Sequence, residues 1–355
     1  MADLFKRVMQ AVYDERMGAE PKSFLSSFFG ARPELVSESD TEIVQIDVIR
    51  DSRKIAVDVI RGGQHANVNQ AMRFSTKEYK VPLYDERVPL TASMLNKRAP
   101  GEDPYQPVNK LARMAAIVAD EQVGQARKVL REIERMAASI FQTGAITLKN
   151  TESLSFGRKS THHVTPTTKW AAGTGNPISD IKALCDVIFQ DGKRKPRKAI
   201  FGSAAWDMFS GNATVKDYLN KLWIKPGEIN PAEVVQGATF QGRIWIGDYQ
   251  LDLYTYNDFY IDATDTLVPY VTTDSVILFD DTADLRKAFG AVELLPEATD
   301  DYRRLGMPTI PEFVPGRIVP YTFSELPSTT WAGIQSAPLL IPTAIDTFGD
   351  LYNVD

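Results

Sequence analysis

One stretch, Lys110 to Phe141, constrains the fold more than any other part of the sequence, because apolar residues recur at helical spacing along it. Asn109 stands before it as a candidate N-cap, and Gly144 follows it where a helix can end. A helix of about 32 residues, rising ~1.5 Å per residue, would be ~48 Å long. We therefore predict one long amphipathic helix.

The residues of this helix also indicate what it packs against. Heptad spacing fails around Gln122 and Gly124, which favours a helix lying on a sheet over a coiled coil. Lys128 and Glu132 stand four residues apart and are predicted to pair. The apolar positions are Leu111, Met114, Ala115, Val118, Val123, Ala126, Val129, Leu130, Ile133, Met136, Ala137 and Ile140.

Composition places the chain among soluble globular proteins. It has 355 residues, 43% hydrophobic and 24% charged, enough for one large domain or two ordinary ones. No apolar run suits a signal peptide or a membrane span, so we expect neither a targeting segment nor a membrane partner. The single Cys185 allows no internal disulfide, which fits assembly in the reducing cytoplasm of the cell that makes the protein.

The charge balance argues against a protein that reads DNA sequence. The net charge is −6, and between Asp248 and Asp301 the only basic residues are Arg286 and Lys287. Proteins that bind DNA specifically usually carry an excess of basic residues on the bound face.

A long hairpin is predicted early in the chain. Residues from Lys54 to Arg61 alternate as in a strand, Gly62 and Gly63 form a loose tip, and a second strand runs from Arg73 to Tyr84. The second strand carries polar residues on both faces, among them Lys77, Glu78 and Lys80, so it does not suit burial in its own domain. The pattern fits an arm that lies on another subunit and fits equally a hairpin washed by solvent.

The C-terminal region contains an apolar strand with prolines at Pro338 and Pro342. Proline has no backbone N–H, and residues four apart in a strand point their N–H groups to the same side. This strand can therefore form a ladder on one side alone. We predict an edge strand whose second side is either guarded against aggregation or directed toward another chain.

The middle of the chain alternates between helices and strands. Residues 151–176 suggest an irregular connection, and the segment around Ile181 and Cys185 suggests an amphipathic helix with the cysteine in the core. A short strand at 198–202, a helix at 204–222 and several strands after Gly242 are expected to follow.

A search for catalytic chemistry finds no convincing site. His65, His162 and His163 lack metal-ligand spacing, and the adjacent pair is expected in a polar surface loop. Gly202 and Ser203 lack the second glycine of a nucleophile elbow.

Two charged clusters have competing interpretations. Asp280, Asp281 and Asp284 are interpreted as a solvated turn, with a divalent-cation site as the alternative. The basic run Lys193–Lys198 is interpreted as a charged turn between a helix and a strand, with phosphate binding as the alternative.

Five stretches follow one another in order and cover most of the chain from about residue 23. They are SFLSSFFGARPELVSESDTEIVQIDVI (23–49), VPLTASMLNKRAPGEDPYQPVNKLARMAAIVADE (88–121), Phe156-Gly157-Arg158 with Trp170 and Pro177–Ile181, KAIFGSAAWDMFSGNATVKDYL (198–219), and QSAPLLIP (335–342). In these stretches the chain resembles the major capsid protein E family of tailed bacteriophages, the family of lambda-like head proteins.

This resemblance implies an α+β protein with the Hong Kong 97-type capsid fold. It implies an N-terminal arm at 1–49, an extended loop at 50–89, a peripheral domain with a spine helix at 90–150, an axial domain at 151–274, and peripheral C-terminal strands with a tail at 275–355. The implied function is structural, with no enzymatic activity and no cofactor: self-assembly, as pentamers and hexamers, into the icosahedral virion shell enclosing double-stranded DNA.

The implied partners are other copies of the chain, a scaffolding protein, a portal protein and, in some members, a decoration protein. Some capsid branches carry a scaffolding domain before the arm, and the short N-terminal segment here predicts a separate scaffolding protein. The predicted intersubunit contacts are Lys54, Arg61, Lys77, Glu78, Lys80, Pro338 and Pro342. The alternatives are an encapsulin-like compartment shell and, from another class, a metal-dependent soluble enzyme that uses the aspartate cluster.

Overall fold

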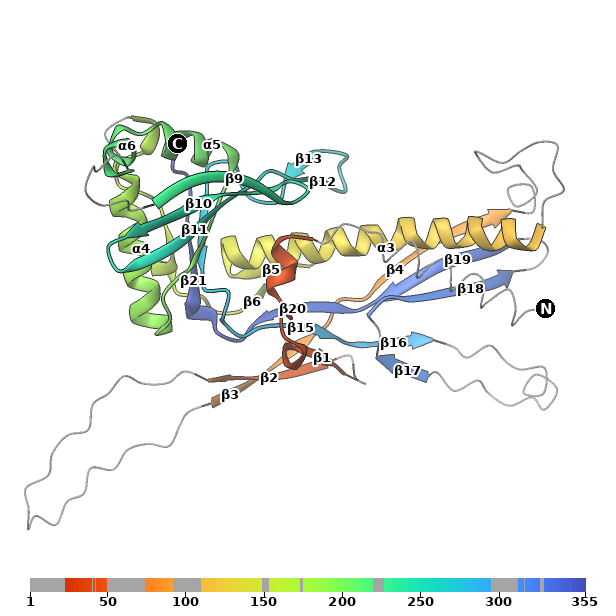
Figure 1. Cartoon of the computed structure of the whole chain (residues 1–355). Coiled ribbons are helices and arrows are strands. Elements are labelled where there is room, and N and C mark those ends of the chain that lie inside the picture. Colours follow the sequence, from red (N-terminus) through yellow and green to blue (C-terminus); the bar gives the residue numbers. More distant parts are fainter. Residues whose placement is uncertain are drawn as a thin grey trace, which may run out of the picture.

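The structure is a computed structural model, and it describes residues 23–39, 41, 43–49, 74–91, 110–148, 153–172, 175–219, 227–294, 312–315, 317–325 and 329–355. Figure 1 shows two parts of different shape, a compact half built on a seven-stranded sheet and an elongated half built along one helix. No helix in the described ranges combines the length and the apolar composition that crossing a membrane requires.

The elongated half is built on the helix α3, Lys110–Thr143, which confirms the predicted long helix. It ends at Gly144, whose φ is +68° and whose amide N–H donates to the Ile140 carbonyl oxygen at 2.8 Å. A left-handed residue of this kind is least costly as glycine. The proposed N-cap, Asn109, lies outside the described residues.

The long helix lies on an antiparallel sheet with the strand order β18-β19-β4 (Figure 1), as the sequence predicts. These strands are Val319–Glu325, Thr329–Ser336 and Tyr84–Thr91. The expected pair between Lys128 and Glu132 is wrong: Lys128 Nζ contacts Glu86 at 3.0 Å, and Glu132 pairs with Arg135 at 2.6 Å. Strand β4 supplies the lysine with a carboxylate from a distant part of the sequence, which the helical spacing could not predict.

The compact half is a mixed sheet with the order β7-β21-β14-β8-β11-β10-β9. It draws its strands from distant parts of the chain, and β21 inserts between β7 and β14. The strands are β7 (His163–Val164), β8 (Lys198–Phe201), β9 (Gly227–Val235), β10 (Ala238–Ile246), β11 (Tyr249–Tyr256), β14 (Val276–Phe279) and β21 (Phe348–Leu351).

The strands β8, β14 and β21 of this sheet are buried on both faces, and their successive side chains, which point to opposite sides, enter different cores. On β8, Ala199 and Phe201 join a core with the helices α4 (Pro177–Gly192), α5 (Ser203–Gly211) and α6 (Ala213–Leu219). Ile200, between them, joins a second core with the C-terminal part of α3 and the N-terminal segment. The strand at 198–202 is therefore confirmed, and this sheet connects the two cores.

The helix expected at 204–222 is wrong in its extent. Asn212 has an extended backbone and separates α5 from α6, and its side-chain oxygen accepts from the Thr214 amide N–H at 2.9 Å. Asparagine favours such caps because its side chain replaces a missing helical acceptor. The expected helix around Cys185 is confirmed, with Asn176 as its N-cap.

A third sheet joins β1 (Val36–Glu38), β15 (Leu285–Phe289) and β20 (Pro338–Pro342) in that order. Strand β20 pairs with β15 alone among the described strands, so its predicted edge position is confirmed. All five of its residues are nevertheless buried, because α3 packs on it.

Shorter elements complete the fold. The hairpin β2–β3 leaves the body in Figure 1, and β12–β13 projects from the end of the seven-stranded sheet. These elements are η1 (Leu25–Phe28), η2 (Pro33–Leu35), β2 (Ile43–Ile49), β3 (Phe74–Lys80), β5 (Ala145–Thr147), β6 (Ser153–Ser155), η4 (Ser160–His162), η5 (Trp170–Ala172), β12 (Phe259–Ile261), β13 (Leu267–Pro269), β16 (Ala291–Leu294), β17 (Glu312–Pro315) and η6 (Ile345–Thr347).

Neither half of the structure is continuous in the sequence. Strand β2 of the hairpin begins at Ile43, before residue 50, and β4 pairs with β19 in the elongated half. Strands β14 and β21 follow residue 274 in the sequence, yet both pair within the seven-stranded sheet.

Candidate assembly surfaces

The hairpin β2–β3 is the first surface that the sequence predicts. Its strands pair from Ile43 opposite Lys80 to Ile49 opposite Phe74. Glu78 and Lys80 are exposed, and Ile43 is 44% exposed although it is apolar. Val44 points to the other side and is buried in the core, so the base of the hairpin is anchored to the body.

The other predicted contact residues of the hairpin are only partly described. Lys77 lies in β3 opposite Ile46, and its side chain lies outside the described part of the structure. Lys54 and Arg61 lie wholly outside the described residues, as does the third histidine of the sequence, His65.

The prolines of β20 occupy the positions that the strand geometry requires. Pro338 faces Phe289 and Pro342 faces Leu285, so both stand at the same kind of position in an antiparallel ladder. Their side chains are buried within one protomer. Direct contact of these prolines with a neighbouring subunit stays a prediction. Their burial within the protomer does not favour it.

A buried carboxylate fixes the N-terminal segment to α3. Glu134 is 2% exposed and accepts the amide N–H groups of Leu25 at 2.6 Å and Ser26 at 2.8 Å. It also accepts the Tyr256 hydroxyl at 3.0 Å, and burial raises the pKa of that phenol. The sequence contains a signal for this site, since Glu134 stands at a core position, four residues after Leu130 and three before Ala137.

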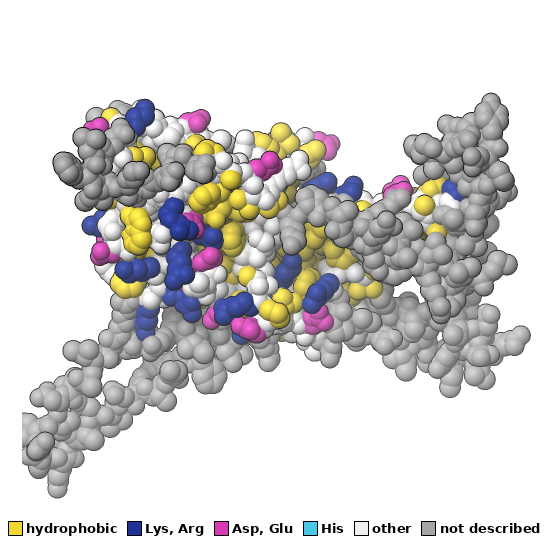
Figure 2. Space-filling model, viewed as in Figure 1, with side chains coloured by type: hydrophobic (Ala, Val, Ile, Leu, Met, Phe, Trp, Pro, Cys, Tyr) yellow, Lys and Arg dark blue, Asp and Glu magenta, His cyan; other side chains and the backbone are white. Residues whose placement is uncertain are grey.

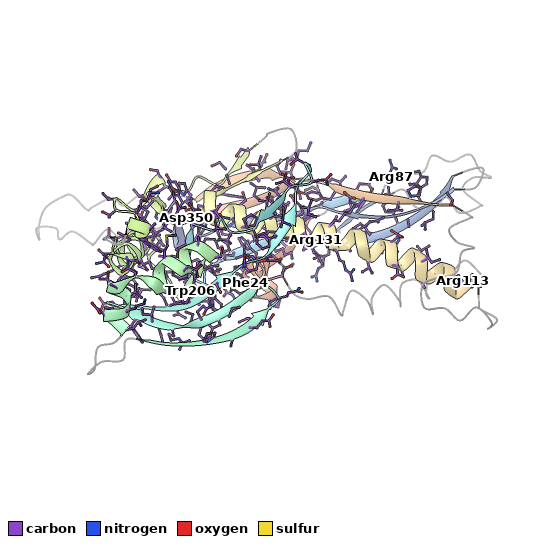
Figure 3. The ribbon with its side chains drawn as sticks, turned by 90° about the horizontal axis from the view of Figure 1, so that it is seen from above. Phe24, Arg87, Arg113, Arg131, Trp206 and Asp350 are labelled. Atoms are coloured by element: carbon purple, nitrogen blue, oxygen red, sulfur yellow. The ribbon has the colours of Figure 1, made fainter. Side chains whose placement is uncertain are left out.

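Two more polar side chains of α3 are buried against the sheet. Gln122 donates to the Tyr321 carbonyl oxygen at 3.1 Å, and Gln125 donates to that of Ala332 at 3.1 Å. The disturbance of the apolar pattern around Gln122 therefore marks a polar strip between the long helix and its sheet. In Figure 3, Arg113 lies near the free end of this helix and Arg131 near the compact half.

A buried ion pair holds β21 in the compact half. Arg158 and Asp350 meet at 2.8 Å with side chains 4% and 1% exposed, and Figure 3 places Asp350 inside this half. Burial raises the pKa of the Asp350 carboxyl group and lowers the pKa of the Arg158 guanidinium group, while their contact opposes both shifts. His163 also contacts Asp350 at 2.8 Å and stacks on Tyr352.

The expected surface loop for the adjacent histidines is wrong at His162. Its side chain is fully buried, with Nδ1 2.9 Å from the Phe348 carbonyl oxygen and Nε2 3.0 Å from Asp191. Lys159 also donates to Asp191, at 2.5 Å, and these hydrogen bonds lower the pKa of the carboxyl group. The histidine thus connects α4 to the strand β21.

The basic run 193–198 is a charged turn between α4 and β8, as interpreted from the sequence. The aspartate cluster supplies its counter-charges. Asp280 lies 3.8 Å from Arg194, and Asp281 lies 3.5 Å from Lys198. The expected solvated turn is wrong at Asp280, which is buried and accepts from the amide N–H of Thr282.

The third aspartate points away from the other two. Asp284 pairs with Arg32 at 2.8 Å, so the three carboxylates have separate partners. Within the described ranges, no three His, Cys, Asp or Glu side chains gather in a way that could hold a metal ion. Cys185 is buried as expected, and burial raises the pKa of its thiol to about 12, far from the range of a reactive cysteine.

The fold has relatives among solved structures. A protein assigned as the capsid protein of a prophage from E. coli CFT073 is 15% identical, with a TM-score of 0.63 over 94% of this chain and 93% of that one. A phage-related protein from Bordetella bronchiseptica RB50 is 10% identical, with a TM-score of 0.50 over 97% and 96%. The fold is the Hong Kong 97-type capsid fold that the sequence implies.

Sequence comparison gives the family. No curated protein matches the chain. The family model described as "Phage major capsid protein E" matches residues 19–350, which is nearly the whole sequence. The chain belongs to the phage major capsid protein E family, whose members are structural, non-enzymatic proteins that form the head shell of the virion.

Proposed function

We propose that this chain forms the shell as pentamers and hexamers on an icosahedral lattice, with a scaffolding protein and a portal protein as assembly partners and, in some shells, a decoration protein. The enclosed genome is double-stranded DNA, held without sequence-specific contacts. A net charge of −6 supports this part, because a wall of phosphate-binding lysines would hinder the movement of packaged DNA.

We assign the compact half to the axial domain and the elongated half to the peripheral domain of a capsid subunit. The elongated half combines a 34-residue helix with strands from both ends of the described sequence. A helix of this length is suited to transmit force between neighbouring subunits, because at ~1.5 Å per residue it spans ~50 Å.

The hairpin β2–β3 is exposed, and this observation supports assembly through the hairpin. Val44 anchors its base, and the two residues that flank this position on β3, Lys80 opposite Ile43 and Glu78 opposite Gln45, are exposed. A two-stranded hairpin is marginally stable in water by itself, so a partner surface would stabilise it. The hairpin is proposed to lie on an adjacent subunit, with Lys77, Lys54 and Arg61 as further contacts.

The test is expression of the full chain alone and with candidate scaffolding proteins, followed by sedimentation and negative-stain electron microscopy. Closed shells or capsomer rings are expected, and shells purified from infected cells are expected to contain DNA and not enzyme cargo. A homogeneous monomer under every condition would contradict the proposal, and enzyme cargo would favour a compartment shell.

Charge reversal tests the contribution of the hairpin β2–β3 to shell assembly. Lys80→Glu is expected to lower the yield of shells at least several-fold while the melting temperature of the unassembled subunit stays unchanged. Lys216→Glu, at an exposed lysine on α6, is the matched control and should assemble normally. Equal yields for the two variants would remove Lys80 from the contact.

A further inference from the structure

His162 lies inside the compact half, and both nitrogen atoms of its ring face oxygen atoms. Its side chain is fully buried, unlike the Lys and Arg side chains that Figure 2 shows at the surface of this half. Nδ1 lies 2.9 Å from the carbonyl oxygen of Phe348 on β21, and Nε2 lies 3.0 Å from Oδ2 of Asp191 on α4. Both distances are those of hydrogen bonds, so the ring has a hydrogen-bond acceptor on each side.

Neither oxygen atom can supply the hydrogen atom of its own contact. A backbone carbonyl group accepts hydrogen bonds and cannot donate them, and an ionised carboxylate is limited in the same way. Lys159 donates to Oδ1 of Asp191 at 2.5 Å, and this hydrogen bond lowers the pKa of the carboxyl group, which favours its ionised form. Both hydrogen atoms must therefore come from the ring. A neutral imidazole has one N–H group, whereas the imidazolium ion has two.

We propose that the ring of His162 is held as an imidazolium ion in the folded subunit, and that its proton controls the contact between α4 and β21. The ring with its contacts to Asp191 and the Phe348 carbonyl group is called the His162 bridge. The bridge is complete when the ring is protonated and is weakened when the ring is neutral. It is a property of the single subunit and goes beyond the proposed function.

Either neutral form of the ring breaks the His162 bridge on one side. A ring protonated only at Nε2 keeps its contact with Asp191 and turns a lone pair toward the Phe348 carbonyl oxygen. A ring protonated only at Nδ1 keeps the carbonyl contact and turns a lone pair toward the carboxylate. A buried acceptor that loses its donor is costly. Histidine is the residue type whose charge ordinarily changes between about pH 5 and 8, which suits it to such a switch.

The His162 bridge lies where β21 enters the seven-stranded sheet. Phe348 is the first residue of β21, and β7 pairs only with Asp350 and Leu351, further along this strand. The ring of His162 adds a contact before that short pairing begins. A methyl group added at Gly349 would lie 2.8 Å from the backbone carbonyl oxygen of His162, so η4 packs closely on β21. A weakened bridge should therefore loosen the start of β21.

The same segment also contacts the long helix. Arg158, four residues before His162, donates to the carbonyl oxygens of Phe141 at 3.0 Å and Gln142 at 2.6 Å, in the last turn of α3. Its guanidinium group also pairs with Asp350 on β21. Residues 158–162 thus connect the end of α3 to β21, and the proton of His162 acts beside the junction of the two halves.

The other charged groups on the elements that pack against η4 have different partners or are exposed. On β21, Asp350 contacts Arg158 and His163, the latter from β7. The remaining titratable side chains of α4 are Asp180, which accepts from the Trp170 indole N–H, Asp186, which accepts from the Tyr249 hydroxyl, the exposed Lys182 and the buried Cys185. Asp191 is therefore the carboxylate that balances the charge of His162.

Nuclear magnetic resonance reads the protonation state of the ring directly. The full chain, labelled with ¹⁵N at histidine, is measured as the unassembled subunit at about pH 7.5. Both ring nitrogens of His162 should have the chemical shifts of an imidazolium ion, whereas histidines of the chain unfolded in urea should be mostly neutral, because their pKa in model peptides is ~6.5. Substitutions His65→Gln and His163→Gln identify the other two histidine signals. A ring of His162 with a single protonated nitrogen would overturn the proposal.

Urea unfolding tests whether this proton stabilises the subunit. Because the folded chain holds a proton that the unfolded chain releases, its contribution is present at low pH and is lost as the pH rises. Between about pH 6 and pH 8.5, the equilibrium constant of unfolding should rise at least five-fold more in the original chain than in Asp191→Asn. The amide of asparagine can donate to a neutral ring nitrogen, so the neutral ring keeps both contacts in this variant. The same pH dependence in both proteins would overturn the proposal.

The neighbouring histidine provides the matched control. Nδ1 of His163 contacts Asp350, and its side chain is 39% exposed, so a neutral ring can keep this hydrogen bond. His163→Gln should retain the pH dependence of the original chain within about two-fold, and His162→Gln should lose it. Loss of the pH dependence in His163→Gln, with its retention in Asp191→Asn, would assign the proton to His163 and contradict the His162 bridge.

Discussion

The compact and elongated halves of this protein bury their sheets in different ways. The central strands of the seven-stranded sheet are covered on both faces, by α4, α5 and α6 on one side and by α3 with the N-terminal segment on the other. The sheet under α3 has aromatic and charged residues on its second face, where Arg87 lies 5.5 Å from the Trp331 ring centroid. Tyr321, on the same face, contacts Asp85.

This difference teaches how stability is divided in a shell subunit. The compact half buries its central strands on both faces, whereas the elongated half has the buried amides of Gln122 and Gln125 between helix and sheet, each with an Oε1 atom that has no hydrogen-bond partner among the described residues. Polar groups at such a contact weaken it relative to apolar packing. An elongated half of this kind fits a subunit that its neighbours complete.

The largest expected effect comes from the residue at which the two halves meet. Phe141 is fully buried, and its ring lies 4.8 Å from Phe279, 5.3 Å from Phe29 and 5.6 Å from Phe348. Phe141→Ala is expected to lower the free energy of unfolding by about 3–5 kcal/mol. Denaturant unfolding of the subunit measures it, and a loss below 1 kcal/mol would show that the halves are not joined through this cluster.

A smaller but more local effect is expected at the carboxylate that holds the N-terminal segment. Glu134→Ala leaves the amide groups of Leu25 and Ser26 without their acceptor, which should cost about 2–4 kcal/mol. Limited proteolysis should then cleave near residue 25 faster than in the original chain. Glu121→Ala, on the same helix, is the control, and equal cleavage rates in both variants would argue against this anchor.

In the compact half, acid is expected to weaken the contacts of Asp191 with Lys159 and His162. The pKa of Asp191 is lowered in the folded state, so its contribution is present above the unfolded value near ~3.9 and is lost as the pH falls through the folded value. Asp191→Asn should lower stability by about 1 kcal/mol at pH 7 and by much less near pH 3. Urea unfolding at both pH values tests this, with Asp217→Asn as the control; a loss that is the same at both values would count against it.

The smallest effect is expected in the middle of the long helix. Apart from its own helical turns, no described part of the chain lies within 4 Å of a methyl group added at Gly124. Because glycine costs a helix roughly 0.5–1 kcal/mol relative to alanine, Gly124→Ala should stabilise the isolated subunit by that amount. Thermal unfolding measures the gain. A destabilised subunit would contradict the open space, whereas a stabilised subunit that assembles poorly would locate a neighbour at this position.

Much of the fold could be predicted from periodicity. The spacing from Lys110 to Phe141 gave the helix that organises the elongated half, and the spacing around Cys185 gave α4 with its buried thiol. The two prolines of β20 predicted that it is an edge strand, since their missing N–H groups exclude a ladder of backbone hydrogen bonds on one side.

The sequence could not show how distant polar residues pair. His162 seemed to belong to a surface loop because its neighbours are polar, but Asp191 and the carbonyl of Phe348, far away in the sequence, bury it. The burial of Pro338 and Pro342 could not be foreseen either, because a proline pattern reports backbone hydrogen bonding and not what packs above the strand. The basic run and Trp245 line one hollow, which the sequence could not show because only the fold brings residues 193–198 beside β10.

The place of β21 in the sheet has a consequence for the synthesis of the protein. Phe348 to Leu351 must insert between β7 and β14, whose residues leave the ribosome much earlier. At ~5–20 residues per second, the roughly 70 residues between β14 and β21 take several seconds to translate. Until then β14 has an unpaired edge and β7 has no neighbour in the sheet. Nascent chains that stop before residue 348 therefore lack a finished compact half, and we expect a growing shell to exclude such incomplete subunits.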